Sequence, residues 1–497
     1  SIAELELGDD HDGIIELAAD APVGTVYADW AGLDDPVIDV SITPNRQDCM
    51  GVRGIARDLA AAGLGTLRPL NEVYKINLDT PNEGSEPAPI VRTDDAAGCP
   101  AFYAQAVSGV RNGDAPEWMR SKLKAIGQKP ISVLVDITNF ISIDLGRPLH
   151  VYDRAKLNGA LVARKAVDGE DMVALNGKTY TLDSTMTVIA DDSMVHDIGG
   201  IMGGEHSGCT EDTTEVFLES AWWDPITVAT TGRALKVNSD ARYRFERGVD
   251  PAFTLPGLDL ATQMILDLCG GEASELAEDG AALDTTRTYK LNPARVISLV
   301  GMDIPEAEQR QTLTALGFKL SGNQVMPPSW RPDVLGDADL VEEVARVASL
   351  TKLEGKPLRR MVPGVPRPIL TPLQVRERAA RRTIAALGYN ECVTYSFIDE
   401  TAAVLFGGGT DAVRVDNPIS SEMTHLRPDL LPGLLRAAAR NQARGFMDLA
   451  LAEVGPAFHG GEPGEQHLQA TGLLVGASAA RDPHGSRRPV DVFDVKA

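Results

Sequence analysis

Long hydrophobic runs are missing from this 497-residue sequence, and so are the short motifs that name a reaction on their own. No apolar stretch approaches the roughly 20 residues that a helix needs to cross a bilayer, so we expect no membrane partner. The sequence has no Gly-x-Ser-x-Gly elbow, no HExxH zinc motif and no set of kinase motifs. An enzyme class therefore does not follow from motif spacing.

Cysteine is scarce and scattered. The five cysteines occur singly, with no CxxC pair: Cys49, Cys99, Cys209, Cys269 and Cys392. This spacing argues against a zinc knuckle and a disulfide framework, and it favours a reducing cytoplasm. The sequence begins with Ser1, and no basic segment followed by an apolar one indicates a secretory leader. We expect a cytoplasmic protein whose natural N-terminus is missing or processed.

Positive charge is also in short supply. Lysine and arginine together number 47 against 71 aspartates and glutamates, which gives a formal net charge of −24. Contacts to phosphate groups need lysine and arginine, and a strongly acidic surface repels nucleic acid. The chain therefore binds no RNA, or binds it through local basic patches or through segments outside this sequence.

The sequence does have the length and the alternating patterns of an α+β multidomain protein. A chain of 497 residues is too long for one core, so three or four domains are expected. Joints rich in proline and glycine indicate domains at residues 1–75, 76–283, 288–358 and 365–497.

Local patterns predict the elements of these domains. The expected helices cover residues 51–63, 306–316 and 340–350, and a stretch that starts near residue 371 and is closed by Gly388. The expected strands cover residues 133–141, 187–191, 214–220 and 491–497. The first three of these strands, separated by glycine and aspartate turns, indicate a substantial sheet in the second domain.

Two stretches combine turn residues with reactive side chains. In residues 42–60, a Pro-Asn turn is expected to cap a helix through the side chain of Asp48. In residues 135–153, Asn139 and His150 lie eleven residues apart across an expected strand and turn. A lone histidine in such a place is more often a structural hydrogen-bonding group than a catalyst.

A third stretch, residues 198–208, holds four glycines within six positions. Glycines let a backbone approach a ligand closely and expose N–H groups to it. The stretch does not match GxGxxG, and no Lys-Ser/Thr pair follows as in a phosphate-binding loop. A tight turn between strands is the simpler interpretation.

Charged residues mark three further places. Glu219 ends an apolar run, where a carboxylate is costly without a partner. Residues 233–248 carry five basic side chains, which indicates a solvated helix face or a phosphate contact. An acidic cluster consists of Asp333, Asp339, Glu342 and Glu343. Its carboxylates suit magnesium, but Asp339 and Glu342 also have the D-x-x-E form of a helix capping box.

Taken in order, these stretches resemble the β subunit of bacterial phenylalanyl-tRNA synthetase over essentially the whole chain. The matching strings are TPNRQDCMGVRGIARDLA, VDITNFISIDLGRPLHVYD, GGIMGGEHSG, LESAWWDP, RYRFERGVDP, PSWRPDV with DLVEEVARV, and NPISSEMTHLRPDLLPGLL. Each string is modest alone, but their shared order and separations are not expected by chance.

The resemblance implies a heterotetramer of two α and two β subunits that joins phenylalanine to tRNA(Phe) with ATP, on a site held by the α subunit. It also implies a sheet-rich editing domain, a small helix-rich domain and a class II synthetase-like domain, which is an antiparallel sheet with helices. Residues 365–497 are expected to form this last domain, truncated and inactive. The family's N-terminal OB-fold tRNA-binding module and C-terminal anticodon-binding module find no counterpart in the sequence.

By the same resemblance, an editing pocket hydrolyses mischarged tyrosyl-tRNA(Phe). The residues that match its motifs are Thr138, Asn139, His150, Gly203, Gly204, Glu219, Ser239 and Ala241. Glu219, with His150 near it, is expected to accept the phenolic hydrogen of tyrosine. Thr138 and backbone N–H groups near Gly203 and Gly204 are expected to position the ester and the attacking water. Ser239 stands where the family often has threonine, which loses a methyl group and loosens the pocket slightly.

The resemblance further implies that Asp333, Asp339, Glu342 and Glu343 are magnesium ligands, and it favours a metal over a capping box alone. Two other functions stay open. One is a synthetase-like paralogue that acts as a scaffold without editing, against which the intact His150 and Glu219 argue. The other is a magnesium-dependent phosphoryl-transfer enzyme, which would need a lysine-containing phosphate cradle beside the acidic cluster.

Overall fold

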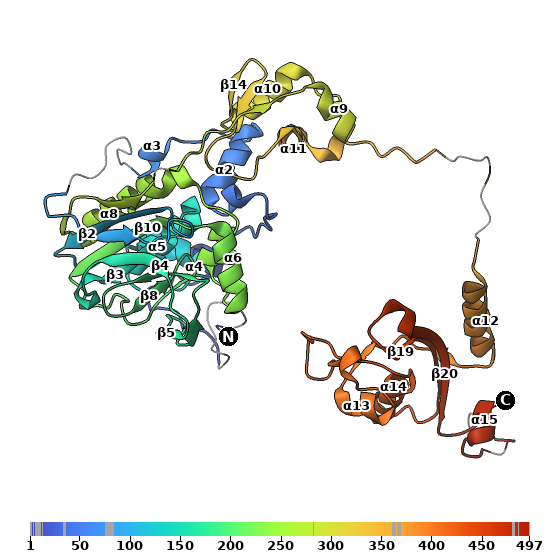
Figure 1. Cartoon of the computed structure of the whole chain (residues 1–497). Helices are drawn as coiled ribbons and strands as arrows, with labels where there is room; N and C mark the ends of the chain where they lie inside the picture. The colour runs from blue at the N-terminus through green and yellow to red at the C-terminus, as the bar shows by residue number, and fades with distance from the viewer. Residues whose placement is uncertain are drawn as a thin grey trace. The chain divides into compact units, whose positions relative to one another are not determined.

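The computed structural model divides the chain into two compact units, Ser1–Lys356 and Pro357–Ala497 (Figure 1). It describes residues 2, 4, 11, 13–32, 36–74, 84–281, 283–359, 364, 369–479, 483–485 and 487–496. Within this part of the chain, no helix combines the length and the hydrophobicity that a bilayer crossing requires.

The centre of the first unit consists of two five-stranded sheets. The first sheet has the order β11-β2-β10-β3, with β12 also paired to β2. Its strands are β2 (Ala101–Ser108), β3 (His150–Asp153), β10 (Glu215–Trp222), β11 (Glu272–Ala273) and β12 (Ala277–Gly280). All of these pairings are antiparallel. Because β10 pairs with both β2 and β3, it lies between them in the sheet.

The second sheet has the order β1-β4-β7-β8-β9. Its strands are β1 (Val91–Thr93), β4 (Leu161–Lys165), β7 (Thr187–Ala190), β8 (Val195–Ile198) and β9 (Met202–Gly203), and β5 (Glu170–Val173) and β6 (Thr179–Leu182) form a separate hairpin. The strands expected over residues 187–191 and 214–220 are confirmed as β7 and β10. Phe102, Ile189 and Phe217 belong to an apolar core that both sheets share.

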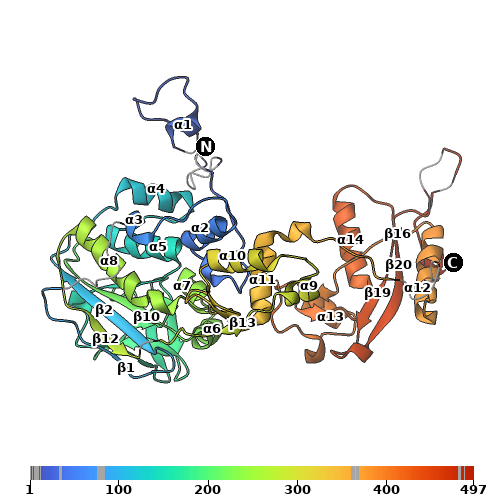
Figure 2. The same ribbon diagram turned by 90° about the horizontal axis from the view of Figure 1, so that it is seen from above.

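Helices cover the other face of the first sheet. They are α4 (Glu117–Ala125), α5 (Val133–Leu145) and α8 (Thr254–Cys269), which Figure 2 shows together beside β2 and β10. Their apolar side chains form a second core with Val216 and Leu218 of β10. Because side chains alternate along a strand, Phe217 points the other way, toward the core between the sheets.

Helix α5 overturns the strand expected over residues 133–141. Val133, Leu134, Ile137 and Ile141 are all buried, which fits one face of a helix; strict strand alternation would not bury the adjacent Val133 and Leu134 together on one face. The β-branched residues give the stretch its local strand propensity, and packing against the sheet overrides it. The helix ends at Gly146, whose φ of 70° is left-handed.

The N-terminal part of the first unit contributes short helices. They are α1 (Tyr27–Trp30), η2 (Gln47–Cys49), α2 (Val52–Ala61) and α3 (Leu70–Tyr74). Helix α2 confirms the helix expected over residues 51–63. Its N-cap is Gly51 and no side chain caps it, so the cap expected from Asp48 is wrong. The carboxylate of Asp48 instead accepts a hydrogen bond from Arg46 (3.0 Å).

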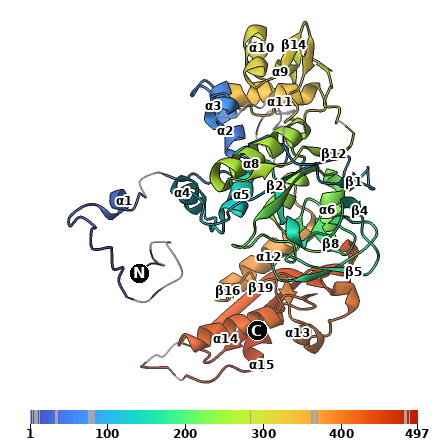
Figure 3. The same cartoon turned by 90° about the vertical axis from the view of Figure 1, so that its left-hand side faces the viewer.

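A smaller body follows the sheets within the first unit (Figure 3). It contains α9 (Ala294–Val300), α10 (Glu306–Ala315), α11 (Asp337–Ala348) and a sheet of β13 (Tyr289–Lys290), β15 (Gln324–Met326) and β14 (Lys319–Ser321). Helix α10 confirms the helix expected over residues 306–316. Helix α11 confirms the one expected over 340–350, but it begins earlier, at Asp337, after the N-cap Gly336.

The second unit has a sheet of order β16-β19-β20. The short β16 (Asn390–Glu391) runs parallel to β19 (Leu449–Phe458), and β19 pairs antiparallel with β20 (Gln466–Val475) along its whole length. Helix α14 (Leu431–Ala443) packs Leu434 and Ala438 against Leu451 of β19. The long β19–β20 hairpin is therefore the main structural element of this unit.

The remaining elements of the second unit are α12 (Pro372–Ala386), α13 (Glu400–Leu405), α15 (Val492–Lys496), β17 (Phe397–Ile398) and β18 (His425–Leu426). Helix α12 starts from a capping box of Thr371 and Gln374, which confirms the helix expected there. Helix α15 overturns the strand expected over residues 491–497. Asp491 accepts the backbone N–H of Phe493 (2.9 Å), a local turn that starts the helix.

Candidate functional site

His150 and Glu219 lie on neighbouring strands. They are direct partners in the antiparallel pairing of β3 with β10. Glu219 points to the same face of β10 as Phe217, because side chains alternate along a strand, and that face looks toward the second sheet. Glu219 is only 5% exposed, so its carboxyl group lies in the space between the two sheets.

The glycine turn brings the second sheet against this pair. A Cβ atom on Gly203 would lie 2.3 Å from Cε1 and 2.9 Å from Nε2 of His150, so only glycine lets β9 approach the imidazole. A Cβ atom on Gly204 would lie 2.9 Å from the carbonyl oxygen of His196. The Gly204 N–H donates to that same oxygen (2.7 Å). This N–H is therefore engaged and not free for an ester.

A third ionisable side chain completes the pocket. Asp197 of β8 is the register partner of Gly203, and its Oδ2 lies 3.9 Å from Nδ1 of His150. Asp197 is 5% exposed. It is absent from the residues predicted from the sequence, although a carboxylate inside the buried strand β8 also carries a desolvation cost.

Burial sets the protonation of these groups. It raises the pKa of Glu219 to about 7, and the positive charge of Arg147 opposes that shift. Burial and the charge of Glu219 raise the pKa of Asp197 well above its usual value. Burial and the nearby His196 lower the pKa of His150 to about 4. Near neutral pH the pocket therefore holds a neutral imidazole and two carboxyl groups that are reluctant to ionise together.

Arg147 is the buried cation beside this pocket. Its Nη2 donates to the hydroxyl of Ser220 (2.8 Å) and to the carbonyl oxygen of Ala221 (2.6 Å). Burial lowers the pKa of Arg147 to about 10, which still leaves it charged at neutral pH. No described carboxylate pairs with it directly, so its charge acts on Glu219 through space.

Thr138 and Asn139 lie on α5, the helix that covers the face of the first sheet opposite the pocket. The hydroxyl of Thr138 donates to the carbonyl oxygen of Val135 (2.8 Å), within the helix. Among the described residues, no hydrogen bond or ion pair links Thr138 or Asn139 to His150 or Glu219. The structure therefore does not join this pair directly to the other predicted residues.

Ser239 and Ala241 lie near the glycine turn. Ser239 is the N-cap of α7 (Asp240–Phe245), which follows α6 (Pro225–Ala234), and its hydroxyl accepts the backbone N–H of Arg242 (3.0 Å). The same hydroxyl donates to the carbonyl oxygen of Ile201 in the turn (2.6 Å). Ala241 packs against the core between the sheets. Ser239 thus ties α7 to the glycine turn.

Much of the basic stretch at residues 233–248 is engaged within the protein. Glu246 pairs with both Arg242 (3.0 Å) and Arg247 (2.6 Å), and Arg244 is buried. The basic side chains of this stretch that are exposed belong to Arg233 and Lys236. Of the five basic side chains, therefore, only Arg233 and Lys236 are exposed as expected for a solvated face, and the other three are paired or buried.

Arginines bind half of the acidic cluster. Nη2 of Arg331 lies 2.7 Å from Oδ2 of Asp333, and its Nη1 contacts Oε2 of Glu343. Nη2 of Arg346 lies 2.7 Å from the same Oε2. Burial opposes the ionisation of Glu343, but the hydrogen bonds from both arginines prevail and lower its pKa to about 2.

The other two carboxylates of the cluster accept hydrogen bonds from uncharged donors. Oδ2 of Asp339 accepts the backbone N–H of Leu335 (2.8 Å), and Oε1 of Glu342 accepts the side-chain amide of Asn45 (3.0 Å). No side chain caps α11 at Gly336, so the expected capping box is wrong.

A magnesium ion held by all four carboxylates does not fit this arrangement, because Asp333 and Glu343 already bind Arg331. In the described part of the chain, three possible metal ligands come together only at Asp48, Cys49 and Asp58. There Arg46 bridges both aspartates (3.0 and 2.9 Å), so that group too is occupied by an arginine.

Three domain families match the chain. The B3/4 domain covers residues 98–270, the tRNA synthetase B5 domain covers 289–349, and the phenylalanyl tRNA synthetase beta chain CLM domain covers 360–497. The phenylalanine–tRNA ligase beta subunit of Cereibacter sphaeroides is 68% identical over 498 residues, which is 99% of this chain. Those of Ruegeria pomeroyi and Bradyrhizobium diazoefficiens are 60% and 49% identical over 99% and 100% of it. The chain belongs to the phenylalanine–tRNA ligase β-subunit family.

The matches divide the predicted residues of this family member between two domains. All eight residues predicted for an editing pocket fall within the B3/4 match, and the four acidic residues fall within the B5 match. The chain spans 61% of the length of the Cereibacter relative and 62% of the other two.

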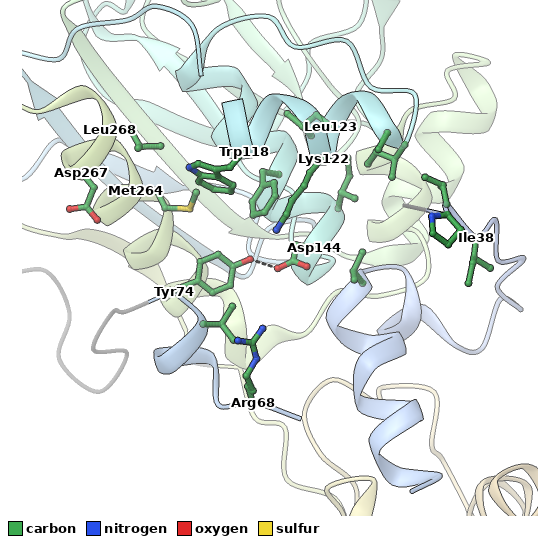
Figure 4. A pocket seen from close by; sticks show the side chains of 18 residues that line it. Ile38, Arg68, Tyr74, Trp118, Lys122, Leu123, Asp144, Met264, Asp267 and Leu268 are labelled. Carbon is green, nitrogen blue, oxygen red and sulfur yellow. Dashed lines mark hydrogen bonds between the residues drawn. The ribbon is translucent and has the colours of Figure 1, made fainter. Parts of the chain in front are cut away.

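A cavity of about 910 Å³ lies elsewhere in the first unit of this β-subunit family member, and no predicted site residue lines it (Figure 4). Trp118 and Phe140 meet edge to face in its wall, with ring centroids 5.4 Å apart. The ammonium group of Lys122 lies over both rings, at 5.7 and 5.8 Å. The hydroxyl of Tyr74 hydrogen-bonds to Asp144 in the same cavity. The cavity is therefore distinct from the pocket around His150 and Glu219.

Proposed function

We propose that this chain is the editing part of a phenylalanine–tRNA ligase β subunit and hydrolyses mischarged tyrosyl-tRNA(Phe). The β subunit supports ATP-dependent charging of tRNA(Phe) by an α subunit, which holds the aminoacylation site, in a heterotetramer of two α and two β subunits. The observation that supports this most is the buried carboxyl group of Glu219, paired across two strands with His150 and closed in by Gly203.

A buried carboxylate can select tyrosine over phenylalanine. A synthetic site shaped for phenylalanine rejects a ligand that merely adds a hydroxyl only weakly, by about 100-fold. In the editing pocket, the phenolic hydroxyl of tyrosine donates to Glu219, whereas a phenylalanyl group leaves that carboxylate buried and unpaired. A site built around such a hydrogen bond reaches discrimination of about 10⁴-fold.

The second unit offers a surface for the α subunit. Helix α12 buries none of its residues within the chain. Large apolar side chains elsewhere in this unit are also exposed, among them Val393 (89%) and Ile419 (89%). Apolar surface of this extent marks a protein interface. We assign it to the contact with α.

The test uses a full-length β subunit assembled with α. Glu219→Ala is expected to slow tyrosyl-tRNA(Phe) hydrolysis by about 100-fold or more, because the pocket loses the partner of the phenolic hydroxyl. Phenylalanine charging should stay unchanged. Glu215→Ala is the matched control, since Glu215 lies on the same strand and is exposed. Unchanged hydrolysis by the Glu219 variant would contradict the assignment of Glu219 to the editing pocket.

A further inference from the structure

Three titratable side chains from both sheets share one buried space. Glu219 comes from β10, His150 from β3 and Asp197 from β8. Gly203 joins them, since it pairs in register with Asp197 and lies against the imidazole. Oδ2 of Asp197 lies 3.9 Å from Nδ1 of His150, a separation that a small rotation of the imidazole would shorten to a hydrogen bond; such bonds are often long before a substrate binds.

The second imidazole nitrogen has nothing to bind. Nε2 of His150 is buried, and no hydrogen-bond partner for it exists among the described residues. A buried polar atom without a partner is costly, and such an atom points to a ligand that completes it. The imidazole is neutral, so one nitrogen carries a proton and the other does not. The partner of Nδ1 decides which.

The surrounding charges decide which carboxyl group keeps a proton. The buried cation Arg147 acts on Glu219 and favours its ionised form. The charge that acts on Asp197 is the negative charge of Glu219, which favours the protonated form of Asp197. One negative charge on Glu219 balances Arg147, and a second one on Asp197 would be buried without compensation.

Two other titratable groups face this space. Tyr152 meets the imidazole of His150 edge to face, with ring centroids 4.3 Å apart, and burial raises its pKa, so its hydroxyl stays neutral. His196 is engaged on its other side, where its Nε2 lies 2.7 Å from Asp191. The hydroxyl of Tyr152 has no hydrogen-bond partner among the described residues, so it makes no hydrogen bond to Nδ1 of His150 in the structure.

We propose that Asp197 is a positioning residue of the editing pocket: its carboxyl O–H donates to Nδ1 of His150 and leaves Nε2–H as a free donor that faces the substrate. The phenolic oxygen of a tyrosyl group then has two partners, since it donates its hydrogen to Glu219 and accepts the Nε2–H of His150. A phenylalanyl group leaves both partners unpaired, which sharpens selection. This inference rests on the proposed editing function.

The tautomer of His150 tests the inference without any assay of editing. Nitrogen-15 NMR of the chain labelled at its eight histidines is expected to show Nε2 of His150 protonated and Nδ1 unprotonated at neutral pH. The signals of His150 are assigned by their loss in His150→Gln. A protonated Nδ1 in the unmodified chain overturns the proposal, whether or not the protein edits.

Two variants of Asp197 show whether its role in the holoenzyme depends on a hydrogen-bond donor or only on the volume of the side chain. Asp197→Asn keeps an N–H donor for Nδ1, so the ratio of tyrosyl-tRNA to phenylalanyl-tRNA hydrolysis should stay within about threefold of the original. Asp197→Leu has no donor and should lower that ratio about tenfold or more. Equal ratios for Asp197→Leu and the original, or equal losses in both variants, overturn the proposal.

The outcomes also separate this inference from the function on which it rests. If Asp197→Leu does not fold, Asp197→Ala takes its place, with the melting temperature as the check. If the holoenzyme hydrolyses no tyrosyl-tRNA(Phe), the proposed function fails, and the NMR measurement still decides the tautomer.

Discussion

Glu219 and His150 are register partners on antiparallel strands, so a carboxyl group and an imidazole lie side by side in a space that two sheets enclose. Neither residue is informative alone, because a histidine before a tyrosine and a glutamate at the end of an apolar run each have ordinary structural explanations. The site exists only once β3 and β10 pair and the glycine turn closes over them.

The glycine turn gives the first prediction. Gly203→Ala puts a Cβ atom 2.3 Å from Cε1 of His150 and forces the imidazole or β9 to move. We expect a loss of stability of about 1–3 kcal/mol and a larger loss of tyrosyl-tRNA(Phe) hydrolysis, measured by thermal unfolding and deacylation. Gly113→Ala is the control, since nothing lies within 4 Å of a Cβ atom there. Normal deacylation by Gly203→Ala would mean that the turn does not shape the pocket.

The rate of editing should depend on pH through Glu219. The ionised carboxylate accepts the phenolic hydrogen more strongly than the neutral acid does, and burial raises the pKa of Glu219 to about 7. Deacylation of tyrosyl-tRNA(Phe) should therefore rise with pH and level off above about 7. Rates corrected for spontaneous ester hydrolysis check this. A flat profile between pH 6 and 8 would contradict the assignment (these limits bracket the raised pKa by about one unit).

The same shift predicts how stability changes with pH. The pKa of Glu219 is raised from 4.5 to about 7, so between these values the native state holds a proton that the unfolded state has released. Stability from this group is thus full below pH 4.5 and falls as pH rises to about 7, by up to about 3 kcal/mol. Glu219→Gln should remove this loss and melt at a higher temperature at alkaline pH. Parallel melting curves for the two proteins would speak against a buried, neutral carboxyl group.

The acidic cluster yields a prediction in which two neighbours differ. Glu343 is fully buried and binds two arginines, so Glu343→Gln should cost about 3–5 kcal/mol. Glu342 is exposed and accepts a hydrogen bond from the neutral amide of Asn45, so Glu342→Gln should cost less than about 0.5 kcal/mol. Thermal unfolding with magnesium and with a chelator separates the explanations. A destabilisation by Glu343→Gln that vanishes with the chelator would restore Glu343 as a metal ligand.

The exposed helix α12 predicts the α-subunit contact. Leu373→Asp, at a side chain that is 58% exposed, should reduce co-purification with α without changing the melting temperature of the chain itself. Val167→Asp is the control, because Val167 is 64% exposed in the first unit. Equal recovery of α with both variants would move the contact away from this helix.

Sequence patterns were sufficient where an element depends on its own residues. The strands β7 and β10 follow from β-prone stretches bounded by glycine and aspartate turns, and the helix α10 follows from its local pattern. Local sequence patterns give the wrong prediction for residues 133–141. Their β-branched side chains favour a strand locally, whereas burial against the first sheet selects the helix α5.

The partners of charged groups could not be predicted, because they depend on contacts between distant segments. The spacing of the four acidic residues does not reveal that Arg331 and Arg346 fold onto Glu343. Asp197 becomes notable only when β8 lies against His150. The spacing of the glycines likewise does not reveal that the N–H of Gly204 donates to the carbonyl oxygen of His196.

The most direct test of the central claim is the selectivity of deacylation by the unmodified β subunit, co-purified with its α subunit. We expect tyrosyl-tRNA(Phe) to be hydrolysed at least about 100-fold faster than phenylalanyl-tRNA(Phe), since only the tyrosyl hydroxyl pairs with Glu219. Equal rates for the two esters, or no hydrolysis of either above the spontaneous rate, would contradict the account.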